Sequence, residues 1–325
     1  MPQIVRIHQT GGPEVLTIED APVIQPGLSE VLIHQSAIGV NYIDIYHRTG
    51  LYKLMSYPIG LGLEAAGVVE KVGRSVTHLQ VGDRVAYCGG PVGAYAEYRT
   101  IPARHVLKLP DGISCEQAAS VMLKGLTAHY LTHLTFRIHP GDTVLVHAAA
   151  GGVGLIACQM AKHLGATVIG TVSSEEKARL ARENGCDYPI IYTQEDMVER
   201  VREYTAGKGV DAVYDSVGKT TFTASLDCLK RFGMMVSFGQ SSGAIPPLDV
   251  GLLSQKGSLY LTRPTLMDHI ENPDEYAANA AALFDLIARG VVHVRIGGIY
   301  HLEEVKKAHA DLESRKTAGA LILQV

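Results

Sequence analysis

The stretch that decides the fold is HAAAGGVGLIACQMAK, residues 147–162. The apolar run TVLVHA (143–148) leads into it, and the residues after the glycines suit a helix, so we predict a buried strand, a tight turn and a helix. A glycine turn in this setting exposes backbone N–H groups and the positive end of the helix dipole, which together bind phosphate. The stretch therefore predicts a dinucleotide site, with a small-residue turn that merely packs tightly as the alternative.

Two registers of the G-x-G-x-x-G/A pattern fit this turn. One uses Gly152, Gly154 and Ala157, but it places its second glycine inside the helix. The other uses Ala149, Gly151 and Gly154, with Gly151 at the turn and Gly154 where the helix packs on the strand. We prefer the second register. Gly151, Gly152, Val153 and Gly154 are then the predicted phosphate-binding residues.

A membrane span is the other interpretation of this region. The 19 residues 143–161 carry no formal charge and are long enough to cross a bilayer. The glycine-rich centre and the β-branched residues before it favour strand, turn and helix instead. The first residues, MPQIVRIHQTGG, show no basic segment followed by an apolar one, so we expect a cytoplasmic protein.

Composition excludes several classes of protein. The 325 residues are 46% hydrophobic and 19% charged, which is typical of folded globular chains. The formal net charge of −4 gives no overall attraction to nucleic acid or acidic membranes. Five cysteines are scattered without a CxxC pair, which argues against both a disulfide framework and a thiolate metal lobe.

The chain divides into regions of different texture. Residues 1–122 consist of short apolar runs between Gly, Pro and Asp, as in a compact β-rich unit. Residues 123–265 alternate strand-like and helical stretches, which predicts a parallel sheet covered on both faces. The expected strands are 143–148, 167–172, 189–192, 211–217, 233–239 and 258–262, and the expected helices are 152–164, 174–184, 195–205 and 219–230.

The end of the second expected strand indicates which nicotinamide cofactor binds. NAD enzymes usually carry Asp or Glu there for the ribose 2′-hydroxyl. Here the strand runs into Ser173, and Lys177 follows one helical turn later, a pair that can hold a 2′-phosphate. Glu175 and Glu176 weaken this interpretation unless they point away. We predict NADP(H) as the cofactor.

Several long motifs then resemble one family. GDTVLVHAAAGGVGLIACQMAK (141–162) and GVNYIDIYHRTGLY (39–52) are similar to signatures of the zeta-crystallin type of NADPH:quinone oxidoreductase, in the medium-chain dehydrogenase/reductase superfamily. YDSVG (214–218), SFGQSSG (237–243) and SLYLTRPTL (258–266) resemble later loops of the same family, so the resemblance covers essentially the whole chain.

The resemblance implies an α/β fold with two domains. Residues 1–122 and 266–325 would form a GroES-like β-rich catalytic domain, and residues 123–265 an inserted Rossmann domain, a doubly wound parallel sheet of six strands. It also implies a homodimer through the edge of the Rossmann sheet near 258–262.

The resemblance further implies a set of cofactor-binding residues. Asn41, Asp44 and Tyr46 would line the nicotinamide end, and Tyr130, Gly152 and Val153 the pyrophosphate. Ser173, Lys177 and Tyr192 would surround the adenosine phosphate. The remaining expected contacts are Ser216, Gly239, Ser241, Ser242, Arg263, Pro264 and Arg315.

No metal site is expected. Zinc members of the superfamily carry a cysteine where this chain has Asn41 and a histidine where it has Leu63. His129 and His133, four residues apart in a probable helix, lack a third ligand in the sequence, and HEXXH is absent.

We therefore expect a metal-free NADPH-dependent quinone reductase. A quinone accepts electrons without a Lewis acid, and Tyr46 and Tyr52 are predicted to be the catalytic residues that shape its pocket by stacking and hydrogen bonding. No proton donor is evident. An enal or enone C=C reductase is the alternative, and a non-catalytic NADPH- and RNA-binding protein is a more distant one.

Overall fold

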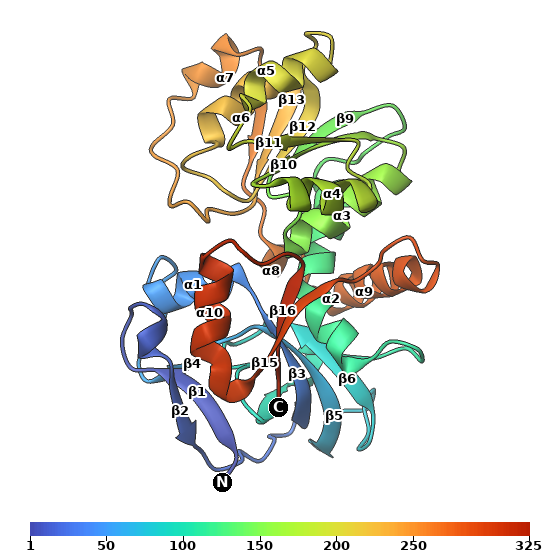
Figure 1. Cartoon of the computed structure of the whole chain (residues 1–325). Helices are drawn as coiled ribbons and strands as arrows, with labels where there is room; N and C mark the ends of the chain where they lie inside the picture. Colours follow the sequence, from blue (N-terminus) through green and yellow to red (C-terminus); the bar gives the residue numbers. More distant parts are fainter. The chain divides into compact units, whose positions relative to one another are not determined.

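Six parallel strands form one sheet in the middle of the chain, in the order β11-β10-β9-β12-β13-β14 (Figure 1). The computed structural model describes residues 1–325. The strands are β9 (Thr143–Val146), β10 (Thr167–Val172), β11 (Tyr188–Ile191), β12 (Val210–Asp215), β13 (Leu229–Ser237) and β14 (Tyr260–Thr262). Strand order reverses between β9 and β12, which is the position where open α/β sheets bind ligands.

Helices connect these strands as the alternating pattern predicts. They are α3 (Gly152–His163), α4 (Glu175–Glu183), α5 (Met197–Tyr204), α6 (Phe222–Cys228), the short α7 (Gly251–Gln255) and α8 (Leu266–His269). Strand residues Leu145, Ile169 and Val213 are fully buried among helix side chains such as Leu226, because both faces of a parallel sheet are covered. The predicted parallel sheet is confirmed.

The rest of the chain forms mostly antiparallel sheets. A seven-stranded sheet has the order β15-β16-β3-β5-β6-β8, with β7 also paired to β3, and a second sheet has the order β2-β1-β4. The strands are β1 (Gln3–Ile7), β2 (Thr17–Asp20), β3 (Glu30–Val40), β4 (Ile59–Gly60), β5 (Glu64–Val72), β6 (Arg84–Cys88), β7 (Tyr98–Pro102), β8 (Val106–Lys108), β15 (Ile296–His301) and β16 (Ala320–Gln324).

Helices α1 (Tyr42–Thr49), α2 (Cys115–Tyr130), α9 (Pro273–Ala288) and α10 (Val305–Glu313) complete the chain's longer helices. Shorter helical turns are η1 (Pro13–Val15), η2 (Ala103–His105), η3 (Leu131–Thr135) and η4 (Leu302–Glu304). None of the helices combines the length and the apolar character that a membrane crossing requires.

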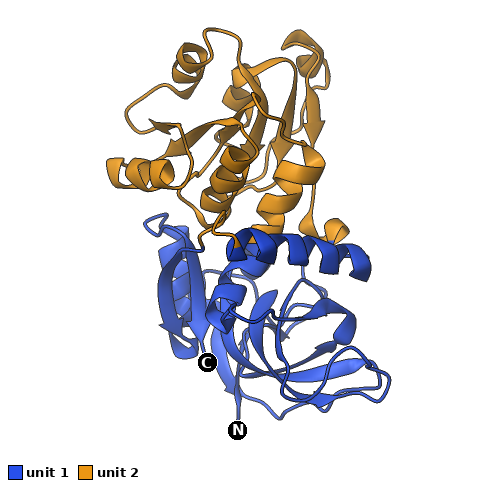
Figure 2. Ribbon diagram, turned by 90° about the vertical axis from the view of Figure 1, so that its right-hand side faces the viewer, with its two compact units in different colours: residues 1–124, 270–288, 294–325 blue, residues 125–269, 289–293 orange.

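The two ends of the chain belong to one unit. Strand β16 pairs antiparallel with β3, with Leu321 opposite Val40, so the last residues complete a sheet begun by the first. Contacts divide the chain into unit 1, residues 1–124, 270–288 and 294–325, and unit 2, residues 125–269 and 289–293 (Figure 2). Unit 2 thus interrupts unit 1 in the sequence. The predicted domain boundaries, 1–122 with 266–325 for one domain and 123–265 for the other, stay a prediction.

Candidate functional site

The predicted cofactor residues of unit 2 follow the carboxyl ends of its six parallel strands. Because the strands are parallel, these ends lie along one edge of the sheet. In chain order the residues are Gly151–Gly154 after β9, Ser173 after β10, Tyr192 after β11, Ser216 after β12, Gly239, Ser241 and Ser242 after β13, and Arg263 and Pro264 after β14.

The glycine turn has a tight, defined geometry. Ala148 adopts a left-handed backbone with φ 51°, and its carbonyl accepts a hydrogen bond of 2.8 Å from the Gly151 N–H. Gly151 is the N-cap of α3, so the free N–H groups of the helix begin at Gly152. A Cβ on Gly154 would stand 2.2 Å from the Ala148 carbonyl oxygen. Only glycine allows this approach of helix to strand, which fits the register Ala149, Gly151, Gly154.

The end of β10 brings a hydroxyl, a helix N-terminus and a cation together. Ser174 is the N-cap of α4, and its Oγ accepts a hydrogen bond from the Lys177 N–H at 3.3 Å. Glu175 and Glu176 are exposed, whereas the side chain of Lys177 is half-buried and its burial lowers the Lys177 pKa. Ser173 is part-buried beside them.

A buried polar network supports this edge, and no sequence motif indicates it. His147 contacts Thr171 Oγ1 through Nδ1 at 3.0 Å and Ser225 Oγ through Nε2 at 2.9 Å. Ser225 in turn donates to Asp215 Oδ2 at 3.2 Å. The network thereby joins the ends of β9, β10 and β12, and burial lowers the pKa of His147.

The loops after β12 and β13 are joined to each other. Asp215 Oδ1 accepts hydrogen bonds from the N–H groups of Val217 and Gly218, at 2.7 and 3.0 Å, which shapes the DSVG turn. The Ser241 N–H donates to the Ser216 carbonyl at 3.1 Å, and Ser242 Oγ donates to the Val217 carbonyl at 2.7 Å.

Arg263 and Tyr130 also have fixed positions in unit 2. The Arg263 guanidinium donates to the Ser237 carbonyl at 2.9 Å, which holds it over the end of β13. Buried Tyr130, the last residue of α2, stacks on His269 with ring centroids 4.4 Å apart.

The first helix of unit 1 carries the residues predicted for the nicotinamide end. Asn41 is the N-cap of α1, and its N–H donates to Asp44 Oδ2 at 2.8 Å. The Tyr95 hydroxyl donates to the same oxygen at 2.8 Å. Asp44 is fully buried, and this burial raises its pKa to about 7.

The Asn41 side chain belongs to a second buried group of contacts. Its Nδ2 donates to Glu64 Oε2 at 2.8 Å, and the Lys124 ammonium lies 3.3 Å from the same oxygen. Glu64 Oε1 accepts from the Leu123 N–H at 2.7 Å. Lys124 stands alone in an apolar helix with no motif around it, so its role could not be recognised from the sequence.

Tyr46 and Tyr52 contact each other, as a shared pocket wall requires. Their ring centroids are 5.0 Å apart at 60°, and the Tyr52 N–H donates to the Tyr46 carbonyl at 3.0 Å. Tyr46 is buried and Tyr52 part-buried. Arg315, just after α10, interacts with the phenol of Tyr42 on the same helix as Tyr46.

Asn41 and Leu63, at the positions where the resemblance implies zinc ligands in other members, offer neither a thiolate nor an imidazole. No three His, Cys, Asp or Glu side chains among residues 1–325 are grouped as a metal site requires. His129 and His133 stack at 4.5 Å, and burial lowers the pKa of His129 to about 4. That the reaction needs no metal stays a prediction.

Comparison with known proteins assigns the chain to a protein family. Residues 27–111 match the model of the alcohol dehydrogenase GroES-like domain, and residues 152–285 that of the zinc-binding dehydrogenase. A quinone oxidoreductase of Pseudomonas aeruginosa is 50% identical over 99% of both chains. The chain belongs to the quinone oxidoreductase family. The crystal structure of Escherichia coli quinone oxidoreductase complexed with NADPH has a TM-score of 0.98 and 49% identity, covering 99% of this chain and 100% of that one.

Membership of this family confirms the predicted zeta-crystallin resemblance and the predicted fold class, a GroES-like domain with a Rossmann domain. The protein is an oxidoreductase. A further relative is the 2-haloacrylate reductase of a Burkholderia species, which is 46% identical over 98% of this chain and 97% of its own.

Proposed function

We propose that this family member is an NADPH-dependent quinone reductase that works without a metal. The observation that carries the proposal is the carboxyl edge of the six-stranded sheet, where a glycine turn, a helix N-terminus, Ser173 and Lys177 stand together. The named activities of the relatives support it, because one is a quinone oxidoreductase and another was solved with NADPH.

The residues present fit the cofactor. Gly154 leaves no space for a side chain against Ala148 and Ala149, and the first N–H groups of α3, which begin at Gly152, suit a pyrophosphate. Ser173 and the half-buried Lys177 suit a 2′-phosphate, and the exposed carboxylates of Glu175 and Glu176 can turn to solvent. When bound, NADPH would supply two electrons and one proton to the substrate.

We assign the other roles as follows. Gly151, Gly152, Val153 and Tyr130 contact the pyrophosphate. Asn41, Asp44 and Tyr46 hold the nicotinamide end, with Tyr46 and Tyr52 as the face on which a flat quinone ring stacks. The remaining cofactor contacts are Tyr192, Ser216, Gly239, Ser241, Ser242, Arg263, Pro264 and Arg315.

Steady-state oxidation of NADPH by 1,4-benzoquinone tests the proposal. We expect turnover with NADPH, much weaker turnover with NADH, and no change on adding zinc or a chelator. Crotonaldehyde and 2-cyclohexenone, tested in parallel, represent the enal and enone alternative. Faster turnover of the enone than of every quinone, a requirement for zinc, or a preference for NADH contradicts the proposal.

We also propose that the protein is a cytoplasmic homodimer joined through the edge of the six-stranded sheet. Strand β14 ends the sheet, and its Tyr260 and Leu261 side chains are 59% and 38% exposed. An uncovered apolar edge strand favours pairing with a second chain. Sedimentation of the wild type and of Leu261→Pro tests this, because proline removes one strand N–H; equal masses at monomer size contradict it.

A further inference from the structure

Unit 1 contains a buried ion pair that the proposed roles do not use. The Lys124 ammonium lies 3.3 Å from Glu64 Oε2, and the two side chains are 8% and 0% exposed. Lysine and glutamate are seldom buried so completely, because removing both charges from water is costly. Stability alone therefore does not explain why an ion pair is buried next to Asn41 and Asp44, and a functional role is expected.

The pair is held rigidly from the carboxylate side. Glu64 accepts hydrogen bonds from the Asn41 side chain and the Leu123 N–H as well as from Lys124. Gly39 lies against it so closely that a Cβ there would stand 2.1 Å from Glu64 Oε2. The carboxylate has no freedom to move, so the ammonium that it binds has a fixed position.

Two polar groups at this pair have hydrogen-bonding capacity that the protein does not fill. An ammonium has three N–H donors, and the structure gives the Lys124 ammonium one hydrogen-bond partner, Glu64 Oε2. Asp44 Oδ1 is buried and has none, because both donors that reach Asp44 go to Oδ2. Buried groups of this kind are expected where a ligand completes the hydrogen bonding.

We propose that the Lys124 ammonium is a catalytic cation that hydrogen-bonds the substrate oxygen on which negative charge develops, and that Glu64 is the positioning residue that fixes it. The inference rests on the proposed quinone reductase activity. It gives the metal-free site its own electrostatic stabilisation of charge, the role that Lewis acids and oxyanion holes have elsewhere.

The chemical balance is simple. A quinone receives two electrons and one proton from NADPH and becomes a hydroquinone monoanion, while NADPH becomes NADP⁺. The negative charge resides on a quinone oxygen, where an N–H of Lys124 stabilises it. A proton from solvent then completes the hydroquinone, and Lys124 is unchanged at the end of the cycle.

The state of Asp44 strengthens this role. Burial raises the Asp44 pKa to about 7, so a large share of this carboxyl is neutral near neutral pH. Glu64 is then the main carboxylate that opposes the charge of Lys124. The positive charge of the ammonium is therefore less completely neutralised than it would be between two ionised carboxylates, and it attracts a negatively charged ligand atom more strongly.

Substitutions at Lys124 test the inference. Lys124→Met removes the cation but leaves Glu64 buried and unpaired, which threatens folding. The double variant Glu64→Gln/Lys124→Met removes both charges and keeps one amide oxygen, which can accept from either Asn41 Nδ2 or the Leu123 N–H. Lys124→Arg restores a cation. Lys108→Met is the control in the same unit. Lys108 also pairs with a buried carboxylate, that of Asp83 at 2.6 Å, but it lies on β8, which carries none of the proposed site residues.

We expect kcat for quinone reduction to fall roughly 100-fold or more in Lys124→Met and in the double variant, with the Kd for NADPH within threefold of the wild type. The fall should be larger for electron-rich tetramethyl-1,4-benzoquinone than for 1,4-benzoquinone. Lys124→Arg should recover part of the rate, and Lys108→Met should match the wild type. A double variant with wild-type kcat, or equal losses on both quinones, overturns the inference.

A second measurement does not depend on turnover. The phenol and phenolate forms of 4-nitrophenol absorb at different wavelengths, so titration of the bound dye reports the charge around it. We expect the wild-type protein with NADP⁺ to bind the phenolate preferentially and the double variant to lose this preference. Equal preference in both proteins overturns the inference. Absent quinone turnover in the wild type would instead contradict the proposed function.

Discussion

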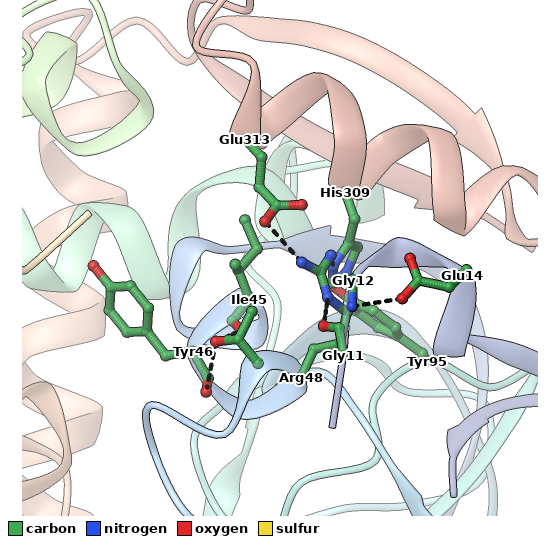
Figure 3. Close-up of polar contacts among 10 residues, drawn as sticks. Gly11, Gly12, Glu14, Ile45, Tyr46, Arg48, Tyr95, His309 and Glu313 are labelled. Carbon is green, nitrogen blue, oxygen red and sulfur yellow. Dashed lines mark hydrogen bonds and ion pairs between the residues drawn. The ribbon is translucent and has the colours of Figure 1, made fainter. Parts of the chain in front are cut away.

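The Arg48 guanidinium donates a hydrogen bond to Nδ1 of His309 at 3.1 Å, which joins helix α1 to helix α10 (Figure 3). Both side chains are fully buried. Because arginine only donates, Nδ1 of His309 must accept, and its Nε2 must carry the hydrogen that faces Tyr95 Oη at 3.0 Å. Tyr95 is thereby left to donate to Asp44. Arg48 therefore sets the direction of the hydrogen bonds that run from it through His309 and Tyr95 to Asp44.

Replacing Arg48 should destabilise unit 1 strongly. Its guanidinium also pairs with Glu313 at 2.7 Å and donates to the Gly11 carbonyl at 3.2 Å, so Arg48→Met leaves several acceptors unpaired. We expect the free energy of unfolding to fall by about 2–4 kcal/mol. Urea unfolding measures this, with Arg179→Met, at an exposed pair with Glu183, as a control that changes little. Equal stabilities would contradict this account of the network.

Asp44 should make stability depend on pH. Burial and, to a smaller extent, repulsion by Glu64 raise the pKa of Asp44 from 3.8 to about 7. The hydrogen bonds from Asn41 and Tyr95 and the attraction of Lys124 lower this pKa but do not offset the burial. The folded protein then holds a proton that the unfolded chain has lost, so the stabilisation is complete below pH 3.8 and declines up to about pH 7.

Comparison with Asp44→Asn isolates this effect, since the amide keeps an oxygen for both donors. Relative to that variant, the wild type should lose up to about 4 kcal/mol of unfolding free energy between about pH 4 and pH 7. Urea unfolding at several pH values measures the difference. A difference that does not vary with pH would show that the Asp44 pKa is close to its value in the unfolded chain.

Lys177→Ala should weaken NADPH binding without affecting NADH. Loss of one charge-assisted contact to a 2′-phosphate should raise the Kd for NADPH about tenfold, equivalent to about 1.4 kcal/mol. Fluorescence titration with both nucleotides measures this. Arg179→Ala, an exposed cation on the same helix, is the control. An equal loss for both nucleotides would remove Lys177 from the 2′-phosphate site.

Gly154→Ala should damage the glycine turn. The new Cβ would approach the Ala148 carbonyl oxygen to 2.2 Å and the Ala149 Cα to 2.8 Å, and backbone atoms cannot give way as side chains do. We expect a loss of about 1–3 kcal/mol in stability and a large loss of NADPH affinity. Gly251→Ala, where a Cβ meets only the Asp249 carboxylate, should leave both unchanged. Wild-type binding in Gly154→Ala would contradict this role of Gly154.

The ring and the hydroxyl of Tyr52 should contribute separately to turnover. Tyr52→Phe keeps the packing against Tyr46 and should lower kcat/KM for quinones by about tenfold, the effect of one hydrogen bond. Tyr52→Leu should lower it further because stacking is lost as well. Tyr57→Phe, 40% exposed in the following loop, is the control. Equal kcat/KM values in all variants would exclude Tyr52 from the pocket.

The unit-2 elements were predictable because each depends on local pattern. The strand 167–172 and the helix start at Gly152 agree with the structure, since a buried strand and a glycine turn have strong local signals. Strand β13 begins at Leu229 rather than at the predicted 233, because the exposed residues Lys230, Arg231 and Phe232 break the continuous apolar run that indicates a buried strand. Short α7 has too few residues for periodicity to reveal it.

The polar clusters were not predictable because they depend on contacts between distant residues. Asn41, Glu64 and Lys124 meet only after β3, β5 and α2 have packed, and no spacing in the sequence encodes that meeting. The same holds for Arg48 and His309 at opposite ends of the chain. The DSVG turn was also missed: the expected strand 211–217 was wrong at its end, because β12 stops at Asp215, whose side chain accepts hydrogen bonds from the next residues and forms a turn.

The crowding around Gly39 restricts which residues position 39 can hold. No side chain fits at position 39 while Glu64 keeps its place, since the backbone carbonyl of Ala119 also stands 2.3 Å from the would-be Cβ. Even a smaller residue at 64 would therefore leave position 39 closed. Position 39 is closed by side-chain and backbone atoms alike, so a larger residue there would require β3 and α2 to move apart.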